Sequence, residues 1–213
     1  LGLIIQDDVM DRDDLRRGVR AVHARYEDRH MGESIAVVAG DLTFGWGMEV
    51  ISKLKIDNEN IVGGIQVWGK YFTRVCYGQA LDVMKIAREE TLLKILALKS
   101  GEYSCVLPLQ LGAALWGADD ELMIKLRDYG MELGWVFQLR DDWLGEYGDP
   151  AKTGKPVGSD SREGKRTFAT MHGREETEAE IARHRARGRA ALQGLTLKEE
   201  LEGLLEWMAT REN

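Results

Sequence analysis

Residues 119–142 read DDELMIKLRDYGMELGWVFQLRDD, and this stretch predicts a long amphipathic helix. Its apolar residues recur at spacings of three and four, which is the periodicity of one face of an α-helix. They are Leu122, Leu126, Tyr129, Leu133, Val136 and Phe137. The acidic run at 119–121 suits the first turn, because carboxylates are favourable at the positive end of the helix dipole. The stretch closes on an acidic pair, Asp141 and Asp142.

Two further stripes with the same spacing predict helices earlier in the chain, and no alternating pattern typical of strands accompanies them. The first consists of Ile35, Val38, Leu42, Trp46 and Val50. The second consists of Ile61, Ile65, Trp68, Phe72, Val75 and Cys76. Thr196 and Glu199 have the spacing of a capping box and predict a last helix that runs to about Arg211. The sequence therefore predicts an all-α protein, a single-domain helical bundle.

Many of the 24 glycines lie inside these stripes instead of in turns. Examples are Gly40, Gly45, Gly47, Gly69, Gly78 and Gly134. A glycine in a helix interior costs about 1 kcal/mol relative to alanine. We therefore expect these glycines to serve close helix packing or to leave room for a ligand.

Composition excludes several classes of protein. The 213 residues are 44% hydrophobic and 31% charged, which is ordinary for a globular chain and excludes a disordered one. A net charge of −7 argues against nucleic acid as the main partner. Cys76 and Cys105 are too few for a disulfide scaffold and predict a reducing, cytoplasmic compartment. No apolar run approaches the roughly 18 residues needed to cross a bilayer, so no integral membrane segment is predicted.

The first candidate metal site is the acidic cluster that ends the apolar run LGLIIQDDVMD. On a helix, Asp7 and Asp11 lie about 40° apart and roughly 6 Å along the axis, with Asp8 beside them. Such carboxylates repel one another unless a cation lies between them. Ligand sets made only of carboxylates favour Mg²⁺ or Ca²⁺, and Mg²⁺ commonly completes its shell with substrate phosphates. The alternative is a solvated acidic helix end.

The second candidate site is the pair Asp141 and Asp142, which follows Gln138 at the end of another apolar stripe. Gly145 stands at its fourth position, so this cluster offers two carboxylates where the first offers three. Two acidic clusters at equivalent places on separate helices indicate the two walls of one metal-lined cavity. The alternative is surface charge at both places.

Basic residues follow each acidic cluster. Arg16 and Arg17 come after the first, and Lys152, Lys155, Lys165 and Arg166 come after the second, within the segment 147–167 that reads as a loop. Any one of these residues alone would be interpreted as a solvated surface charge. Carboxylate metal sites beside fixed cations instead indicate a ligand with phosphate groups, because the metals bridge the phosphates and the basic side chains bind their outer oxygens.

Several segments together resemble the trans-isoprenyl diphosphate synthases, the polyprenyl synthetase family, and the archaeal and bacterial geranylgeranyl members look nearest. They are DDVMDRDDLRRG at 7–18, GQALD at 78–82, KSG at 99–101, FQLRDD at 137–142, GDPAKTGKPVGSD at 148–160 and EGKRT at 163–167. The resemblance implies a helical bundle of the isoprenoid synthase type around a central cavity. It also implies a homodimer.

The resemblance assigns roles to residues where the motifs coincide. Asp7, Asp8 and Asp11 match the first aspartate-rich motif and Asp141 and Asp142 the second, which implies Mg²⁺ as cofactor with three ions per active site. The positions implied for diphosphate binding are Arg16, Lys99, Lys155 and Lys165, with Arg17 at the isopentenyl diphosphate. The catalytic positions implied are Lys99 together with Ser100, Gln79 and Gln138, and these last three resemble the polar groups near the developing allylic cation.

Three departures from the family pattern stand out. Gly145 replaces the usual third aspartate of the second motif, which weakens one metal ligand. The upstream basic motif that serves the isopentenyl diphosphate site is absent, and the chain opens on the apolar run Leu1 to Ile5 without an initiator Met or a cap. The stretch after Thr167 is shorter than usual. We therefore expect residues 1–213 to be one domain that lacks its N-terminal helices.

The function implied is a Mg²⁺-dependent condensation of an allylic diphosphate with isopentenyl diphosphate to give a longer trans-polyprenyl diphosphate. The growing chain is expected to pass Leu3 and Gly2, which leave the passage open and indicate a product of twenty carbons or somewhat more. A Gly2→Phe substitution is then expected to shorten the product. Two alternatives remain: a class I terpene cyclase, and a non-catalytic subunit of a heteromeric prenyl synthase.

Overall fold

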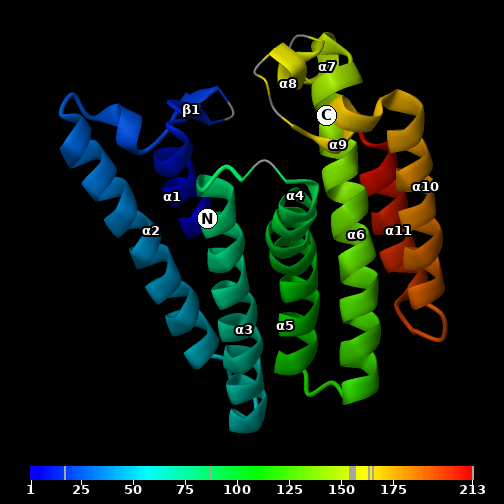
Figure 1. Ribbon diagram of the computed structural model, residues 1–213. Coiled ribbons are helices and arrows are strands. Elements are labelled where there is room, and N and C mark those ends of the chain that lie inside the picture. The colour runs from blue at the N-terminus through cyan, green and yellow to red at the C-terminus, as the bar shows by residue number, and fades with distance from the viewer. Residues whose placement is uncertain (17, 87, 154–156, 163, 165, 213) are drawn as a thin grey trace. The chain divides into compact units, whose positions relative to one another are not determined.

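The computed structural model describes residues 1–16, 18–86, 88–153, 157–162, 164 and 166–212. Within these ranges the regular structure is helical apart from one two-stranded hairpin, which confirms the all-α prediction (Figure 1). The chain divides into two compact units, residues 1–65 and residues 66–213, and the boundary falls inside helix α3 (Asn58–Val83).

The first unit carries the first acidic cluster. Before α3 its elements are α1 (Gly2–Asp11), β1 (Leu15–Arg16), β2 (Val19–Arg20), the 3-10 helix η1 (His23–Arg25) and α2 (Arg29–Ser52). The two strands form an antiparallel hairpin at the end of α1, with Leu15 opposite Arg20 (Figure 1). α2 begins where the side chain of Asp28 accepts a hydrogen bond from the backbone N–H of Met31 at 2.8 Å, an N-cap that satisfies one of the helix's unpaired donors.

Helices α1 and α2 pack closely because glycines lie at their crossing. A Cβ atom added to Gly2 would come within 2.3 Å of Thr43 Oγ1 and 2.7 Å of the Gly40 carbonyl oxygen. A Cβ added to Gly40 would likewise come within 2.7 Å of the Gln6 side chain, which donates to Asp41 Oδ1 at 2.9 Å. The space beside Gly2 is thus filled by α2, so the interpretation of Gly2 as an open passage is wrong.

The outer face of α2 is apolar and exposed. Its large exposed residues are Met31, Ile35, Val37, Val38, Leu42, Trp46 and Val50. The stripe predicted to form a helix does so, but within this structure it faces outward instead of into a core. α2 is also long and apolar enough to cross a membrane by length and composition, with a mean hydropathy of 1.3 over a window of which 17% is buried. A single helix of this kind is weak evidence for a membrane span.

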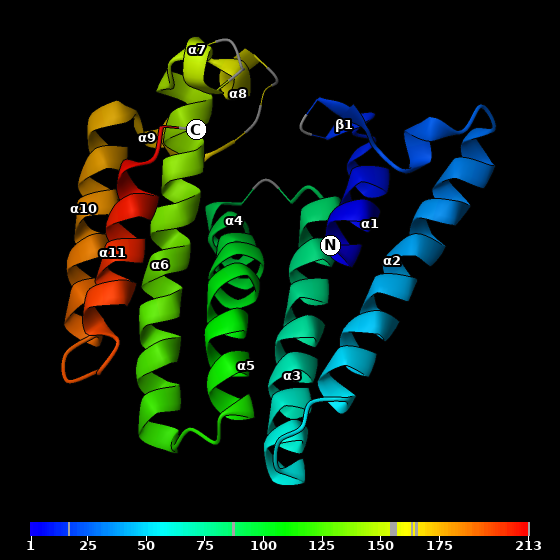
Figure 2. The same ribbon diagram turned by 180° about the vertical axis from the view of Figure 1, so that it is seen from behind.

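The second unit is built around the longest helix, α6 (Asp120–Tyr147). The elements after α3 are α4 (Glu89–Leu96), the π-helix η2 (Ala97–Val106), α5 (Leu107–Leu115), α6, α7 (Pro150–Thr153), α8 (Ser159–Arg162), α9 (Phe168–His172), α10 (Arg174–Ala191) and α11 (Lys198–Thr210). α6 contacts η2 and α5 on one side and α10 and α11 on the other (Figure 2). Its N-cap is Asp119, whose side chain accepts from Leu122 N at 2.8 Å, as the acidic run predicts.

The core of this unit forms where the apolar stripe of α6 packs against η2, α10 and α11. Its buried members are Cys105, Tyr129, Leu133, Val136, Leu139, Ile181, Leu192, Leu205 and Ala209. Tyr129 is fully buried, and its hydroxyl donates to the Leu201 carbonyl at 2.7 Å, so its polar atom is satisfied. Burial raises the pKa of the Cys105 thiol to about 12, which fits a cysteine that only packs.

Several predicted boundaries differ from the structure. α11 begins at Lys198, and its N-cap, Leu197, makes no side-chain capping bond, so the capping box assigned to Thr196 is wrong. A capping box forms instead at Thr167, the start of α9. The segment 147–167 contains the short helices α7 and α8.

Candidate active site

The first acidic cluster occupies the last turn of α1, and its three carboxylates differ in burial. Asp8 is buried, Asp7 is partly buried and Asp11 is exposed. The helix ends here because Arg12 adopts a left-handed conformation, φ 61°, and its N–H donates to the carbonyl oxygens of Asp8 and Val9. Three aspartates in the last turn of a helix are unfavourable, because they lie at the negative end of the helix dipole. Cations nearby would therefore stabilise the cluster.

Arg16 supplies one of those cations. It reaches back from β1, and its Nε donates to Asp8 Oδ1 at 2.7 Å, with a second bond from Nη2 to the same oxygen. Its Nη2 also lies 3.4 Å from Asp13 Oδ2. The hydrogen bond to Asp8 raises the pKa of the guanidinium, which is charged at neutral pH in any case. The short turn between α1 and the hairpin therefore places a predicted diphosphate ligand beside the predicted metal ligands.

The second acidic pair lies on α6, and its two members again differ. Asp142 is 4% exposed, and both its oxygens are engaged: Oδ1 accepts from Gln138 Nε2 at 2.9 Å, and Oδ2 accepts from the backbone N–H of Phe168 at 3.0 Å. Asp142 thus fixes the start of α9. The side chain of Asp141 is 42% exposed and pairs with Arg211. Because α6 continues to Tyr147, the pair does not close the helix, contrary to the sequence interpretation.

The π-helix η2 brings the KSG motif to α6. Ser100 Oγ donates to Gln138 Oε1 at 2.7 Å, so Ser100, Gln138 and Asp142 form a continuous hydrogen-bonded chain. Lys99 Nζ lies 2.7 Å from Asp82 Oδ2 on α3. Gln79, on the same helix, is partly buried three residues before Asp82. Among the described residues of this unit, the structure therefore groups most of the predicted polar residues.

Glycines allow η2 to pack closely against α6 on one side and against α3 on the other. A Cβ added to Gly134 would come within 2.4 Å of Gly101 Cα and 2.9 Å of the Ser100 carbonyl oxygen. On the other side of η2, a Cβ added to Gly78 would meet the Leu98 side chain at 2.9 Å. π-Helical segments often occur at functional sites, since they change the direction of side chains within a helix. The glycines at 78 and 134 confirm the close-packing prediction. At Gly45, Gly47 and Gly69, by contrast, an added Cβ atom would have nothing within 4 Å.

Three predicted substrate ligands, Arg17, Lys155 and Lys165, lie outside the described residues. Lys152 is described, and its Nζ pairs with Glu212 at 2.5 Å. Sequence reasoning also missed partners that only the fold supplies. Asp82 was visible within the GQALD segment, but nothing in the sequence pointed to Arg211 as the partner of Asp141.

The donor chemistry of both clusters fits Mg²⁺. All the candidate ligands are carboxylate oxygens, which hard divalent cations prefer. Among the described residues, no group of three or more histidine, cysteine or acidic side chains is close enough to form a complete metal cage. Mg²⁺ does not require one, because it usually binds one or two carboxylates and keeps waters or substrate phosphates.

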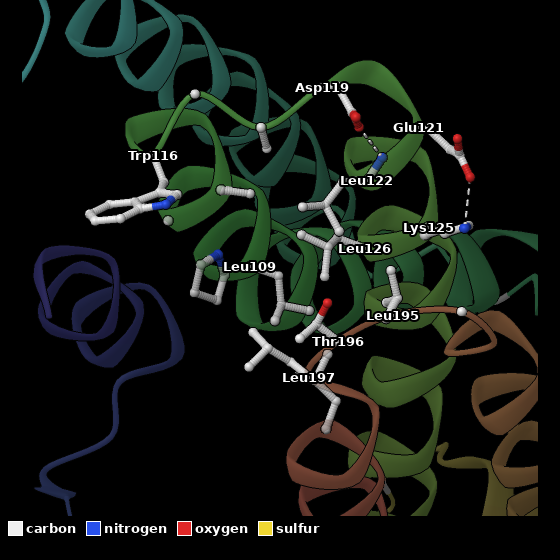
Figure 3. Close-up of a pocket in the computed structure, with 17 residues that line it drawn as sticks. Leu109, Trp116, Asp119, Glu121, Leu122, Lys125, Leu126, Leu195, Thr196 and Leu197 are labelled. Atoms are coloured by element: carbon white, nitrogen blue, oxygen red, sulfur yellow. Dashed lines mark hydrogen bonds and ion pairs between the residues drawn. The ribbon is translucent and has the colours of Figure 1, made fainter.

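A pocket of about 690 Å³ lies elsewhere in the second unit, where the start of α6 meets α5 and the loop between α10 and α11. Its apolar side chains include Leu109, Leu122, Leu126, Leu195 and Leu197 (Figure 3). Asp119 lies at the edge of this pocket. It is 22 residues before Asp141 of the second acidic pair, which corresponds to about 33 Å along a helix. None of the predicted site residues lines it, so it is separate from the candidate active site.

The fold and these clusters define an all-α protein with carboxylate sites of the kind that hold Mg²⁺ beside phosphates. The family model for polyprenyl synthetase matches residues 2–198. The short chain isoprenyl diphosphate synthase of Methanocaldococcus jannaschii is 36% identical over 171 residues, which cover 79% of this chain and 50% of that protein. The geranylgeranyl diphosphate synthase of Methanosarcina mazei is 35% identical over 174 residues, covering 79% and 52%.

The fold of this chain is also similar to that of a solved structure. The geranylgeranyl pyrophosphate synthase of Corynebacterium glutamicum, complexed with isoprenyl diphosphate and magnesium, has a TM-score of 0.84 at 28% identity and covers 99% of this chain and 75% of its own. The chain belongs to the polyprenyl synthetase family. It spans about half the length of the curated relatives that it matches.

Proposed function

We propose that the protein is a Mg²⁺-dependent trans-prenyltransferase that joins an allylic diphosphate to isopentenyl diphosphate. The observation that carries this proposal is the hydrogen-bonded chain Ser100–Gln138–Asp142, which links the KSG motif to the second acidic pair in a chain of this family. Asp7, Asp8, Asp11, Asp141 and Asp142 are the proposed ligands of three Mg²⁺ ions. When bound, Mg²⁺ neutralises the negative charge of the leaving diphosphate.

The basic side chains bind the diphosphates in this proposal. Arg16 is already charged and fixed by Asp8, so it offers its remaining donors without a large loss of side-chain freedom. Lys99 is positioned by Asp82 and contributes a second positive charge. Charged donors held in place before the reaction stabilise the departing anion more than mobile ones do, because little reorganisation remains to be done.

The polar groups of η2 and α6 act on the carbocation that forms as the diphosphate leaves. The Ser100 hydroxyl donates its hydrogen bond to Gln138 Oε1, so the lone pairs of its oxygen remain available to face positive charge. The double bond of isopentenyl diphosphate attacks the allylic carbon, a carbon–carbon bond forms, and a proton passes to the released diphosphate. The reaction needs an apolar surrounding, since water would capture the cation.

The partner of the exposed α2 face is proposed to be a second copy of the chain. The face carries a continuous apolar stripe, from Ile35 to Val50, and large exposed apolar patches mark interaction sites. Assembly as a homodimer would remove this surface from water. We also propose a cytoplasmic location, since reduced cysteines and a net charge of −7 are typical of cytosolic enzymes.

Product analysis tests the proposed reaction. The protein would receive isopentenyl diphosphate and allylic primers of increasing length, with and without Mg²⁺, and the products would be identified by mass. We expect a Mg²⁺-dependent product of twenty carbons or somewhat more. Diphosphate release without uptake of isopentenyl diphosphate would instead indicate a terpene cyclase. No reaction in either condition would indicate a non-catalytic subunit.

Product length is proposed to be twenty to twenty-five carbons. Relatives that this chain resembles are named geranylgeranyl and geranylfarnesyl diphosphate synthases. Leu3 lies four residues before Asp7 and so on nearly the same helix face, where it would border the growing chain. Gly2 does not, because α2 fills the space beside it.

Substitutions at these two neighbouring positions are expected to differ. Leu3→Phe should shorten the main product, because a ring one turn before Asp7 fills space along the chain. Gly2→Phe should instead lower the free energy of unfolding by about 1–3 kcal/mol, the usual cost of overpacking, since it collides with Thr43 and Gly40. Product mass and thermal melting of both variants check this. An unchanged product in Leu3→Phe would mean that other residues limit the chain.

A further inference from the structure

The two aspartates of the second acidic pair are held by different parts of the chain. Asp142 is fixed through both oxygens by Gln138 and by the start of α9. Oδ1 of Asp141 accepts from Nη2 of Arg211, the residue that follows α11 and lies 70 positions later. In the part of the chain that the structure describes, no side chain or backbone donor binds Oδ2 of Asp141. The orientation of Asp141 therefore depends on Arg211.

Arg211 is itself held firmly against α6. Its side chain is 11% exposed, its Nη2 also lies 3.5 Å from the Phe137 carbonyl oxygen, and its guanidinium lies 5.0 Å from the centre of the Phe137 ring. Nε of Arg140 donates to the Arg211 carbonyl at 2.8 Å, which ties down the backbone. These contacts all involve residues 137–141 of α6, so Arg211 is a fixed donor.

We infer that Arg211 is a positioning residue that orients Asp141 for metal binding. The inference rests on the proposed function, because it takes Asp141 to be a metal ligand. With Oδ1 bound to Arg211, the carboxylate is held in one orientation, and Oδ2 stays available to a metal ion. Groups that hydrogen-bond a metal ligand fix its direction, and their loss commonly weakens metal binding 10- to 100-fold.

If Arg211 instead competed with the metal, its removal would change the metal affinity in the opposite direction. A guanidinium that merely competed with the metal for Asp141 would weaken metal binding, so its removal would increase the affinity. The buried, multiply bonded state of Arg211 favours positioning, because a competing group must leave and this one would abandon its contacts with Phe137. The direction of the change in metal affinity therefore decides between the two roles.

The test measures binding of Mn²⁺ in the presence of inorganic pyrophosphate by titration calorimetry, without turnover. We expect Arg211→Met to weaken the binding that depends on Asp141 by 10- to 100-fold. Arg211→Lys keeps a charged donor and should restore most of the affinity. In an Asp141→Asn background, Arg211→Met should cause no further loss, because the two residues act through one interaction. Unchanged or tighter binding in Arg211→Met would overturn the inference.

A matched control separates positioning from general damage to α11. Arg185 pairs with Glu206 and ties α10 to α11, with side chains 30% and 31% exposed. Arg185→Met should lower the melting temperature but leave Mn²⁺ affinity unchanged; an equal loss of affinity would mean that any loosening of α11 suffices and would overturn the inference. If Asp141→Asn itself leaves binding unchanged, the proposed metal site fails instead.

Discussion

Replacing Asp7 with asparagine is expected to lower kcat/KM by about 10²–10³-fold, the usual cost of losing one group that stabilises charge in a transition state. Asparagine keeps the size of the side chain and removes its negative charge, so the loss reports on metal binding. Asp7 lies on the last turn of α1, where it is partly buried beside Asp8. Steady-state kinetics over a range of Mg²⁺ concentrations would measure the effect.

Asp13 offers a matched control for this substitution. It is also an aspartate near Arg16, at 3.4 Å from Nη2, but it lies beyond the end of α1 and its side chain is 51% exposed. Asp13→Asn should change kcat/KM by less than about fivefold, because exposed ion pairs contribute roughly 0–1 kcal/mol. Near-native turnover of Asp7→Asn, or an equal loss in both variants, would contradict the assignment of the first cluster as a metal site.

Gly134→Ala is expected to destabilise the protein, although it adds only one methyl group. The added methyl group would lie 2.4 Å from Gly101 Cα and 2.8 Å from Gly101 N, and both are backbone atoms that cannot rotate away. The free energy of unfolding should fall by about 1–3 kcal/mol, which corresponds to a decrease in melting temperature of roughly 2–12 °C for a chain of this size. Because η2 must move, Ser100 and Lys99 should also be displaced, and kcat should fall.

Gly203→Ala is the control for this prediction. Gly203 lies within α11, and nothing lies within 4 Å of an added Cβ. Here alanine should raise the free energy of unfolding by about 0.5–1 kcal/mol, since it improves helix propensity without a collision. Thermal or urea unfolding of both variants would show opposite signs. A Gly134→Ala variant as stable as the parent chain would mean that η2 can shift without cost.

The helices could be predicted from the sequence because their stripes are local. Spacings of three and four residues around Leu126 and Leu133 reflect the geometry of a single helix, which does not depend on the rest of the fold. Helix ends were less predictable. Thr196 has the spacing of a capping box, yet the chain enters α11 through Leu197, because local capping signals compete with the path of the preceding loop.

By itself the sequence determined the helical class, the two acidic clusters and the order of the motifs, since each of these depends only on residues close together in the chain. Only the tertiary structure decided which partner each carboxylate has. Asp142 binds the start of α9, and Asp141 pairs with Arg211 from the far end of the chain. In the folded structure the apolar stripe of α2 is exposed, and residues of α2 fill the space beside Gly2. Such contacts join residues tens of positions apart, and chain folding alone brings them within bonding distance.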